Sequence, residues 1–296
     1  MSKTYRSLSG RRVRAVEDVS FEVVPGEVLG IAGPNGAGKS TILALTLGFL
    51  RPTSGAIAID GMDPRAYVER HGISYVPELM ALPTHWTTQA ALTRLAVLAG
   101  VSRARIKREV ERVIDALAIG EHRHKRLRAL SKGNFQRVGL AQALLTETRI
   151  VIFDEPTHGL DPVWTQKFRE IVAGLKHADR TIVIASHNLD ELERLADRVA
   201  IIDKGRVQRI VQVSGATTST HVAYRIRVVA GADAVLSCFP GAALGANGDV
   251  EVPPVDIVTL NEALAAAIGS GGLVSSVAPS EGALEQAFHS SVGKGP

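Results

Sequence analysis

Nine consecutive residues near the N-terminus combine glycines, a lysine and two hydroxyl side chains in an order that suits the binding of phosphate groups. They are Gly33, Pro34, Asn35, Gly36, Ala37, Gly38, Lys39, Ser40 and Thr41. The order satisfies the pattern G-x-x-x-x-G-K-[ST], and apolar runs precede and follow it, as expected for a loop between a strand and a helix. Glycines let such a loop curl until its backbone N–H groups point inward, and the first turn of the helix adds further unpaired donors. Lys39 can then reach the β- and γ-phosphates and the Ser40 hydroxyl can ligate Mg²⁺, so we predict that the chain binds a nucleoside triphosphate.

Two carboxylates and a histidine follow apolar runs further along the chain. Asp154 and Glu155 come directly after residues 150–153, and His187 stands just past the next apolar run. In a parallel sheet both positions open on the edge that carries the phosphate loop. Asp154 can hold Mg²⁺ through water beside Ser40, whereas Glu155 points elsewhere and suits the orienting or deprotonation of an attacking water. We expect His187 to contact the γ-phosphate.

Strand-like and helical patterns alternate around these residues, which indicates an α/β fold. Residues 28–32 and 181–185 are continuous apolar runs of the kind found in buried parallel strands. Residues 13–16 and 20–24 alternate polar and apolar side chains, which predicts two further strands near the N-terminus. The residues from about 79 to 147 have helical spacing and no strand candidate, and we interpret them as a helical insertion.

The sequence divides into a large and a small part. Residues 1–213 carry every motif described so far, and residues 214–220 are small and polar, which is typical of a linker. Residues 221–296 return to short strand-like and helical patterns without a catalytic constellation. We therefore predict a small C-terminal α+β accessory domain.

Composition limits the classes of function only weakly. The chain has 296 residues, of which 45% are hydrophobic, and a formal net charge of +4. Its single cysteine, Cys238, excludes an intramolecular disulfide and favours a reducing cytosol. No apolar run approaches the roughly 18 residues of a membrane span. The basic cluster at residues 122–128 contains no aromatic residue, so we interpret it as a solvated face and place its histidines, and His158, on the surface.

Five segments occur in the order and spacing of ABC-transporter ATPases, and residues 1 to about 212 resemble that family closely. The segments are residues 33–41, 130–134, 150–156, 159–161 and 186–187. The resemblance implies a P-loop NTPase fold of the ABC ATPase type, with an antiparallel β subdomain beside the helical insertion. It also implies a Mg²⁺-dependent ATPase with ATP and Mg²⁺ as cofactors, in which Lys39, Glu155 and His187 are catalytic.

Further site residues follow from the same resemblance. The signature segment, which in this family reaches across a dimer to the γ-phosphate on the other subunit, corresponds to Ser131, Lys132, Gly133 and Asn134. Asp161 resembles the D-loop aspartate at the dimer seam, and His187 resembles the switch histidine. Tyr5 looks like the aromatic residue that stacks on adenine.

Three residues depart from the common family pattern. Lys132 and Asn134 stand where glycine and glutamine are most often found, and Glu78 stands at the Q-loop position, where glutamine is expected. Both segments look like the variants of bacterial ABC-2-type exporters, and residues 282–288 resemble the ending of their accessory domain. A carboxylate at position 78 tolerates a cation but repels a phosphate, so we expect Glu78 to join Ser40 and Asp154 as a metal ligand.

The favoured function is therefore an ATPase subunit that dimerises head to tail around two ATP molecules and drives a separate membrane permease, with export as the expected direction of transport. We expect a homodimer, cytoplasmic and peripheral on the inner face of the membrane, with no nucleic acid as partner. The permease is expected to dock near residues 86–89, although Trp86 as core filling is an equal alternative. A soluble ABC ATPase acting on nucleic acid or ribosomes is the other hypothesis, but the chain lacks tandem nucleotide domains and a long coiled coil. A GTPase is disfavoured because no N-K-x-D segment follows the strands.

Overall fold

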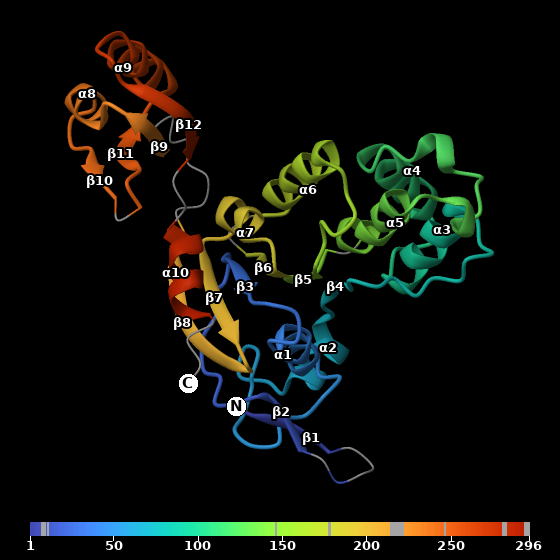
Figure 1. Cartoon of the computed structure of the whole chain (residues 1–296). Helices are drawn as coiled ribbons and strands as arrows, with labels where there is room; N and C mark the ends of the chain where they lie inside the picture. The colour runs from blue at the N-terminus through green and yellow to red at the C-terminus, as the bar shows by residue number, and fades with distance from the viewer. Residues whose placement is uncertain are drawn as a thin grey trace. The chain divides into compact units, whose positions relative to one another are not determined.

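The computed structural model describes residues 1–6, 10, 12–145, 147–176, 179–213, 222–245, 247–279 and 283–292. The chain forms two compact units, one of residues 1–215 together with 287–296 and the other of residues 216–286 (Figure 1). The predicted linker, residues 214–220, lies outside the described residues. The sequence analysis assigned all of 221–296 to the small domain, whereas the structure groups the residues from 287 onward with the first unit. Of these, residues 287–291 are the second half of the helix α10, Ala283–Ser291, and the types of its apolar side chains do not indicate which core they join.

A six-stranded sheet forms the centre of the first unit, in the order β4-β5-β6-β3-β7-β8. The strands are β3 Val28–Ala32, β4 Ser74–Val76, β5 Ile150–Asp154, β6 Thr181–Ser186, β7 Arg198–Asp203 and β8 Arg206–Gln212. Neighbouring strands run parallel except β7 and β8, which are antiparallel. The carboxyl ends of parallel strands open on one edge of the sheet, so the residues that follow β3, β5 and β6 meet there. The α/β fold expected from the sequence is confirmed.

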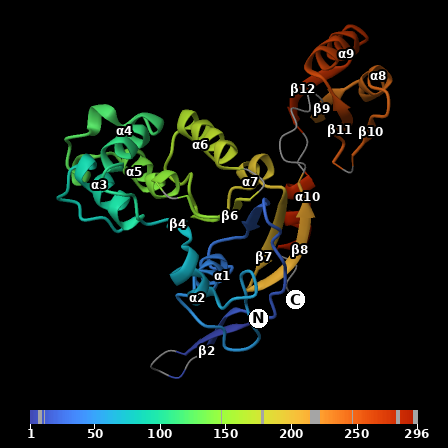
Figure 2. The same ribbon diagram turned by 180° about the vertical axis from the view of Figure 1, so that it is seen from behind.

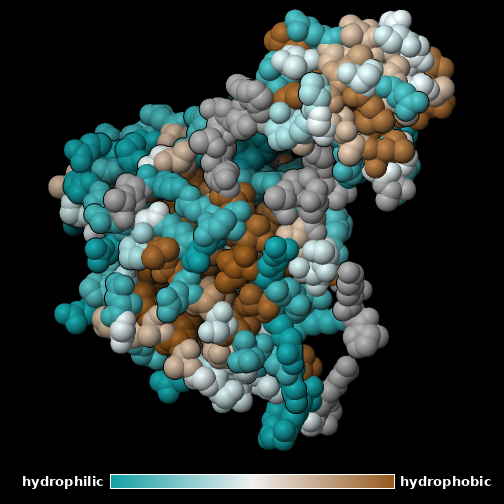
Figure 3. All heavy atoms as spheres, turned by 90° about the vertical axis from the view of Figure 1, so that its left-hand side faces the viewer, coloured by the Kyte–Doolittle hydropathy of each residue, from teal (hydrophilic) through white to brown (hydrophobic). Residues whose placement is uncertain are grey.

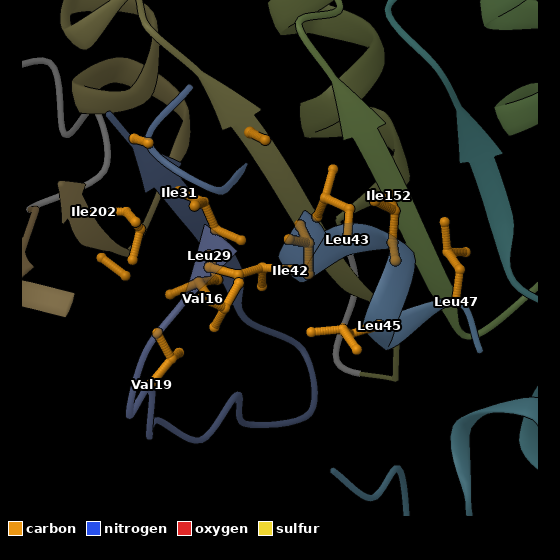
Figure 4. Close-up of a cluster of buried hydrophobic side chains, with 14 residues drawn as sticks. Val16, Val19, Leu29, Ile31, Ile42, Leu43, Leu45, Leu47, Ile152 and Ile202 are labelled. Carbon is orange, nitrogen blue, oxygen red and sulfur yellow. The ribbon is translucent and has the colours of Figure 1, made fainter. Parts of the chain in front are cut away.

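Helices cover both faces of this sheet (Figures 1 and 2). They are α1 Lys39–Thr46, α2 Pro64–His71, α6 Pro162–Leu175 and α7 Leu189–Leu195. Successive residues of β3 point to opposite faces: Leu29 packs with the apolar side of α1 (Figure 4), whereas a Cβ added to Gly30 would lie 3.2 Å from Leu192 of α7. Because all five residues of β3 are buried, strand and helix hold the loop between them from both ends.

The N-terminal antiparallel region is smaller than the sequence predicts. The strands β1, Lys3–Arg6, and β2, Arg12–Val16, pair with each other. The strand predicted at residues 20–24 is wrong: Arg198 donates from Nη2 to the Glu22 carbonyl at 2.7 Å, and the Val24 N–H donates to the Glu27 carboxylate at 2.9 Å. Side chains thus form hydrogen bonds with backbone groups that would otherwise pair with a neighbouring strand.

The helical insertion is confirmed as a group of helices between β4 and β5. It contains α3 Thr88–Leu98, α4 Ile106–Ala116, the short 3₁₀ turns Gly120–His122 and Leu127–Ala129, and α5 Lys132–Leu145. In Figures 1 and 2 its three α-helices lie together, beyond β4. Thr87 caps α3 through a hydrogen bond from the Ala90 N–H at 3.2 Å.

The second unit is a four-stranded antiparallel sheet with two helices. Its elements are β9 Val222–Ala230, α8 Ala232–Cys238, β10 Ala243–Leu244, β11 Val250–Val255, α9 Ile257–Gly269 and β12 Leu273–Pro279. The strand order is β10-β11-β9-β12, and the element order β-α-β-β-α-β is that of the ferredoxin-like motif. Ile226, Val235, Phe239 and Val250 are buried in its core. The α+β character matches the expectation from the sequence.

The surface of the first unit carries both hydrophilic and hydrophobic side chains. Figure 3 shows hydrophilic side chains around a hydrophobic area on the first unit. Among the residues that the structure describes, no helix combines the length and the apolar character required to cross a bilayer.

Candidate active site

The loop between β3 and α1 leaves no room for side chains at two of its glycines. A Cβ added to Gly33 would lie 2.4 Å from the carbonyl oxygen of Ile202, and one added to Gly38 would lie 2.5 Å from the carbonyl oxygen of Ala15. Gly38 also has a φ of +109°, a conformation that side chains disfavour. These two close approaches bring the loop against neighbouring backbone and explain why glycine is required at both positions.

A cavity of about 340 Å³ opens in front of this loop. It is lined by Ala15, Pro34, Asn35, Gly36, Gly38, Lys39, Ser40, Thr41, Glu78, Asp154 and Glu155. The structure therefore brings most of the predicted phosphate loop together with three carboxylates that come from distant parts of the sequence. A cavity of this size, with one lysine and a hydroxyl at its floor, suits the phosphate end of a nucleotide.

Lys39 is the cation at the centre of this cavity. Its side chain is 6% exposed, its Nζ donates to the Gly33 carbonyl at 2.7 Å, and it lies 3.3 Å from Oε1 of Glu155. The ammonium group is thus already aimed between the loop and the carboxylates. A phosphate placed in the loop would meet a positive charge without a large rearrangement of the lysine.

Asp154 has the environment of a metal ligand. It is buried, the Ser40 hydroxyl hydrogen-bonds to it, and its Oδ1 has no hydrogen-bond partner. Burial first, and then the charges of Glu155 and Glu78, raise the pKa of Asp154, while Ser40 and Lys39 act in the opposite direction. An unpaired carboxylate oxygen beside a hydroxyl fits a hard cation.

No group of three or more His, Cys, Asp or Glu side chains within the described part of the chain is arranged to hold a metal on its own. This agrees with the way Mg²⁺ is usually bound, by one or two protein oxygens together with phosphate oxygens. Ser40 and Asp154 would hold it, and Glu78 lines the same cavity.

Glu155 is held in one orientation by several donors. Its Oε2 lies 2.8 Å from Nδ1 of His187, and the backbone N–H of His187 and the Ser186 hydroxyl each donate to the same oxygen at 3.3 Å. Its backbone has a φ of +48°, which is unusual for a residue with a side chain and typical of functional sites. Glu155 and His187 are therefore brought together, as predicted, although His187 itself does not line the cavity.

His158 is exposed, as the sequence analysis expected, and it also lies beside these groups. Its Nδ1 is 4.0 Å from Oε1 of Glu78, and its ring centre is 6.3 Å from that of His187. The signal that could have indicated it is its place in the short turn directly after Asp154 and Glu155. The turn brings it to the same edge of the sheet.

The predicted signature residues lie away from the cavity of their own chain. Ser131 caps α5 by accepting a hydrogen bond from the Asn134 N–H at 3.2 Å. The side chain of Lys132 lies over Gly159, where an added Cβ would come within 2.9 Å of Lys132 Cε. Neither these residues nor Gly133 line the cavity, so within one chain the first turn of α5 is separate from the phosphate loop.

Asp161 and Tyr5 occupy defined positions in their elements. Asp161 caps α6 by accepting a hydrogen bond from the Trp164 N–H at 2.9 Å. The guanidinium of Arg137, on α5, lies 3.5 Å from the centre of the Trp164 ring. Tyr5 pairs with Val13 across β1 and β2 and is not part of the cavity lining.

Comparison with known proteins connects this geometry to one family. The model of the family described as "ABC transporter" matches residues 16–158. The ABC transporter ATP-binding protein NatA of Bacillus subtilis is 37% identical over 199 residues, which are 66% of this chain and 80% of NatA. The Nod factor export ATP-binding protein I of Rhizobium etli is 33% identical over 208 residues, which are 70% of this chain and 64% of that protein. The chain spans less than two thirds of the length of several curated relatives that it matches.

Among solved structures, the ATP-binding cassette MJ0796, described as a dimer in a post-hydrolysis state with bound ADP and Pi, is similar in fold. The TM-score is 0.65 at 24% sequence identity, over 73% of this chain and 97% of the cassette. The fold of the first unit is thus that of an ATP-binding cassette.

Proposed function

The chain belongs to the ABC transporter family, and we propose that it is the ATP-binding and ATP-hydrolysing subunit that powers a separate membrane permease. The observation that carries the proposal is the single cavity in which the phosphate loop, the cation Lys39 and the carboxylates Asp154 and Glu155 meet. Binding groups and a candidate base are both present there. The same relatives favour transport over action on nucleic acid or ribosomes.

In the proposed reaction the protein positions the phosphates and one water. The loop amides and Lys39 bind the β- and γ-phosphates, and Ser40 and Asp154 hold Mg²⁺, which neutralises charge on the phosphate oxygens when bound. Glu155 accepts a proton from the water that attacks the γ-phosphorus, the bond between this phosphorus and the β–γ bridging oxygen breaks, and ADP and inorganic phosphate are released. His187 orients the Glu155 carboxylate through the 2.8 Å contact between its Nδ1 and Oε2 of Glu155. General-base catalysis of this kind contributes roughly 10²–10⁴ in rate.

We further propose that two copies of the chain form a head-to-tail homodimer around two ATP molecules. The first turn of α5 carries Ser131, Lys132, Gly133 and Asn134 and lies outside the cavity of its own chain, so its free donors and its lysine are available to a second chain. The cassette MJ0796 is described as a dimer, which supports the same arrangement here. Asp161 and Tyr5 are proposed at the dimer seam and at the adenine, respectively.

The partner in the membrane and the direction of transport are inferred from relatives and from one surface region. We propose export, because one relative is named a Nod factor export protein, and a permease contact near Glu78 and the loop before α3. Trp86 in that loop is half-buried beneath the Arg94 guanidinium, 4.3 Å from its ring. A chain so docked would sit peripherally on the cytoplasmic face of the membrane.

Phosphate release by the purified chain with Mg·ATP tests the hydrolysis. We expect Lys39→Ala to abolish turnover, because the only lysine of the cavity lining is lost, while Lys107→Ala, at an exposed position on α4, keeps the wild-type rate. Glu155→Gln is expected to bind ATP and to hydrolyse it at least about tenfold more slowly. Normal turnover by Lys39→Ala would refute the assignment.

Sedimentation of the Glu155→Gln variant tests the dimer. With Mg·ATP the variant is expected to become dimeric, and adding Ser131→Arg is expected to keep it monomeric with unchanged ATP binding, because a bulky side chain then faces the partner's phosphates. A variant that remains monomeric at all ATP concentrations would contradict the head-to-tail arrangement.

A further inference from the structure

His122 lies against the signature segment rather than on a solvated face. Its side chain is 12% exposed, and its Nε2 is 2.7 Å from the amide nitrogen of Asn134. Its Nδ1 is buried without a hydrogen-bond partner, and Glu121 is 3.3 Å from Nε2. One hydrogen bond joins His122 to Asn134 in either orientation of the Asn134 amide, since each group can donate or accept.

The segment that follows His122 is fixed by the loop that carries Trp86. Four backbone hydrogen bonds join the two stretches: Thr88 N–H to Lys125 O at 3.0 Å, Gln89 N–H to Arg123 O at 3.0 Å, Leu127 N–H to Trp86 O at 2.9 Å, and Arg128 N–H to Thr84 O at 3.0 Å. Arg123 is also paired with Glu111 of α4, through a hydrogen bond of 3.0 Å from Nη1. The residues 122–128 are therefore an internal brace between the Trp86 loop and the signature helix.

Asn134 is supported from two directions. Its backbone N–H donates to the Ser131 hydroxyl at 3.2 Å, and its side chain bonds to His122. The first contact is local and forms the helix cap, whereas the second joins α5 to His122 in the segment that precedes it. Without the second contact the Asn134 side chain would be held only by its own helix, although Lys132 of the same turn would still pack over Gly159.

We propose that His122 is a positioning residue for the signature segment. Its bond to Asn134 fixes the first turn of α5 relative to the Trp86 loop, so that the donors of this turn keep one direction. The inference rests on the proposed function, in which that turn meets the ATP held by the partner subunit. His122 itself touches no nucleotide in this scheme, and its effect is transmitted through Asn134.

The test compares four single variants and one double variant of the full chain in the Glu155→Gln background. His122→Ala removes the bond, and His122→Gln keeps a polar group near the position of Nε2. His124→Ala is the matched control, because His124 belongs to the same basic segment and is exposed. Asn134→Ala removes the partner. The dimerisation constant with Mg·ATP is measured by sedimentation, and the ATP affinity of the monomer is measured separately with a fluorescent nucleotide.

We expect His122→Ala to weaken ATP-dependent dimerisation roughly two- to tenfold, the range of one hydrogen bond, with monomer ATP affinity unchanged. His122→Gln is expected to recover at least half of the lost dimerisation, and His124→Ala is expected to leave dimerisation unchanged. The double variant His122→Ala/Asn134→Ala is expected to dimerise as well as the single variant with the larger defect, because both substitutions remove the same bond. Equal dimerisation by His122→Ala and the control, or additive effects in the double variant, would overturn the proposal.

Hydrogen exchange on the nucleotide-free monomer separates this proposal from the dimer model. We expect His122→Ala, but not His124→Ala, to speed the exchange of the backbone amides at residues 134–136. If the Glu155→Gln parent never dimerises, the proposed function fails while this measurement still decides the role of His122. Unchanged exchange in His122→Ala refutes the positioning role whatever the parent does.

Discussion

Replacing Asp154 with asparagine tests whether its buried charge is unfavourable when neither nucleotide nor metal is bound. The Asp154 side chain is 4% exposed and one of its oxygens has no partner. Burial, followed by the neighbouring charges of Glu155 and Glu78, raises its pKa, and the opposing effects of Ser40 and Lys39 do not reverse that direction. Asparagine has nearly the same shape without the charge. We therefore expect the nucleotide-free Asp154→Asn variant to be more stable than the wild type and, having lost its cation ligand, to be almost inactive.

The magnitude and its pH dependence follow from the raised pKa. Relieving an unfavourable group at a functional site stabilises a protein by about 0.5–2 kcal/mol. About 1 kcal/mol moves the melting temperature of a unit of this size by roughly 2–4 °C, so the gain at pH 7.5 is about 1–8 °C. Above the ordinary pKa of 3.8 the folded state binds this proton more tightly than the unfolded chain. The contribution of Asp154 to the stability of the folded wild type therefore falls as pH rises and recovers as pH falls through the raised pKa. The stability difference between Asp154→Asn and the wild type consequently shrinks in acid.

Thermal unfolding between pH 5 and pH 8, in EDTA and without nucleotide, measures this difference. Asp115→Asn is the control, because Asp115 is exposed on α4, and it is expected to shift the melting temperature little. A lower melting temperature for Asp154→Asn would refute the reasoning, as would an advantage that grows on acidification.

Two smaller effects are expected elsewhere in the first unit. Glu78→Gln removes the negative charge of a predicted Mg²⁺ ligand, and since Glu78 is 43% exposed we expect Mg·ATP binding to weaken only roughly two- to fivefold; tighter binding in a nucleotide titration would refute Glu78 as a metal ligand. Trp164→Leu removes the ring beneath the Arg137 guanidinium and is expected to cost about 0.5–2 kcal/mol beyond its lost packing, as measured by urea unfolding. Trp164→Phe keeps part of that ring face and serves as the comparison, and an equal loss in both variants would argue against a cation–π contribution.

The phosphate loop and the residues at the strand ends could be predicted from the sequence because short contiguous segments encode them. Lys39 and Ser40 follow a buried strand in an unbroken motif, and Asp154 and Ser186 end two further apolar runs. Parallel topology then brings these ends to one edge without any knowledge of side-chain packing. The roles of the site residues remain predictions.

Long-range partners explain where the sequence interpretation failed. The alternation at residues 20–24 is typical of a strand, but Arg198, 176 residues away, donates to the carbonyl of Glu22, and no local pattern encodes that contact. The cluster at residues 122–128 has the composition of a solvated face. The side chains of His124, Lys125, Arg126 and Arg128 are exposed as expected, and the interpretation misses only the backbone register with residues 84–89 and the low exposure of His122.

The charge balance of the cavity gives a physical reason why, under the proposed function, hydrolysis would require a second copy of the chain. Among the residues that the structure describes, Lys39 is the only basic one in a lining that also contains Glu78, Asp154 and Glu155, so a bound triphosphate would add negative charge to a site that is already acidic. Mg²⁺ offsets part of that charge, but the lining offers no second cation for the developing transition state, whose charge spreads over the γ-phosphate oxygens. The first turn of α5 carries unpaired helix donors and Lys132 outside its own cavity. Positive potential supplied by a second copy would fill this deficit, and hydrolysis would then depend on dimerisation for electrostatic reasons as well as geometric ones.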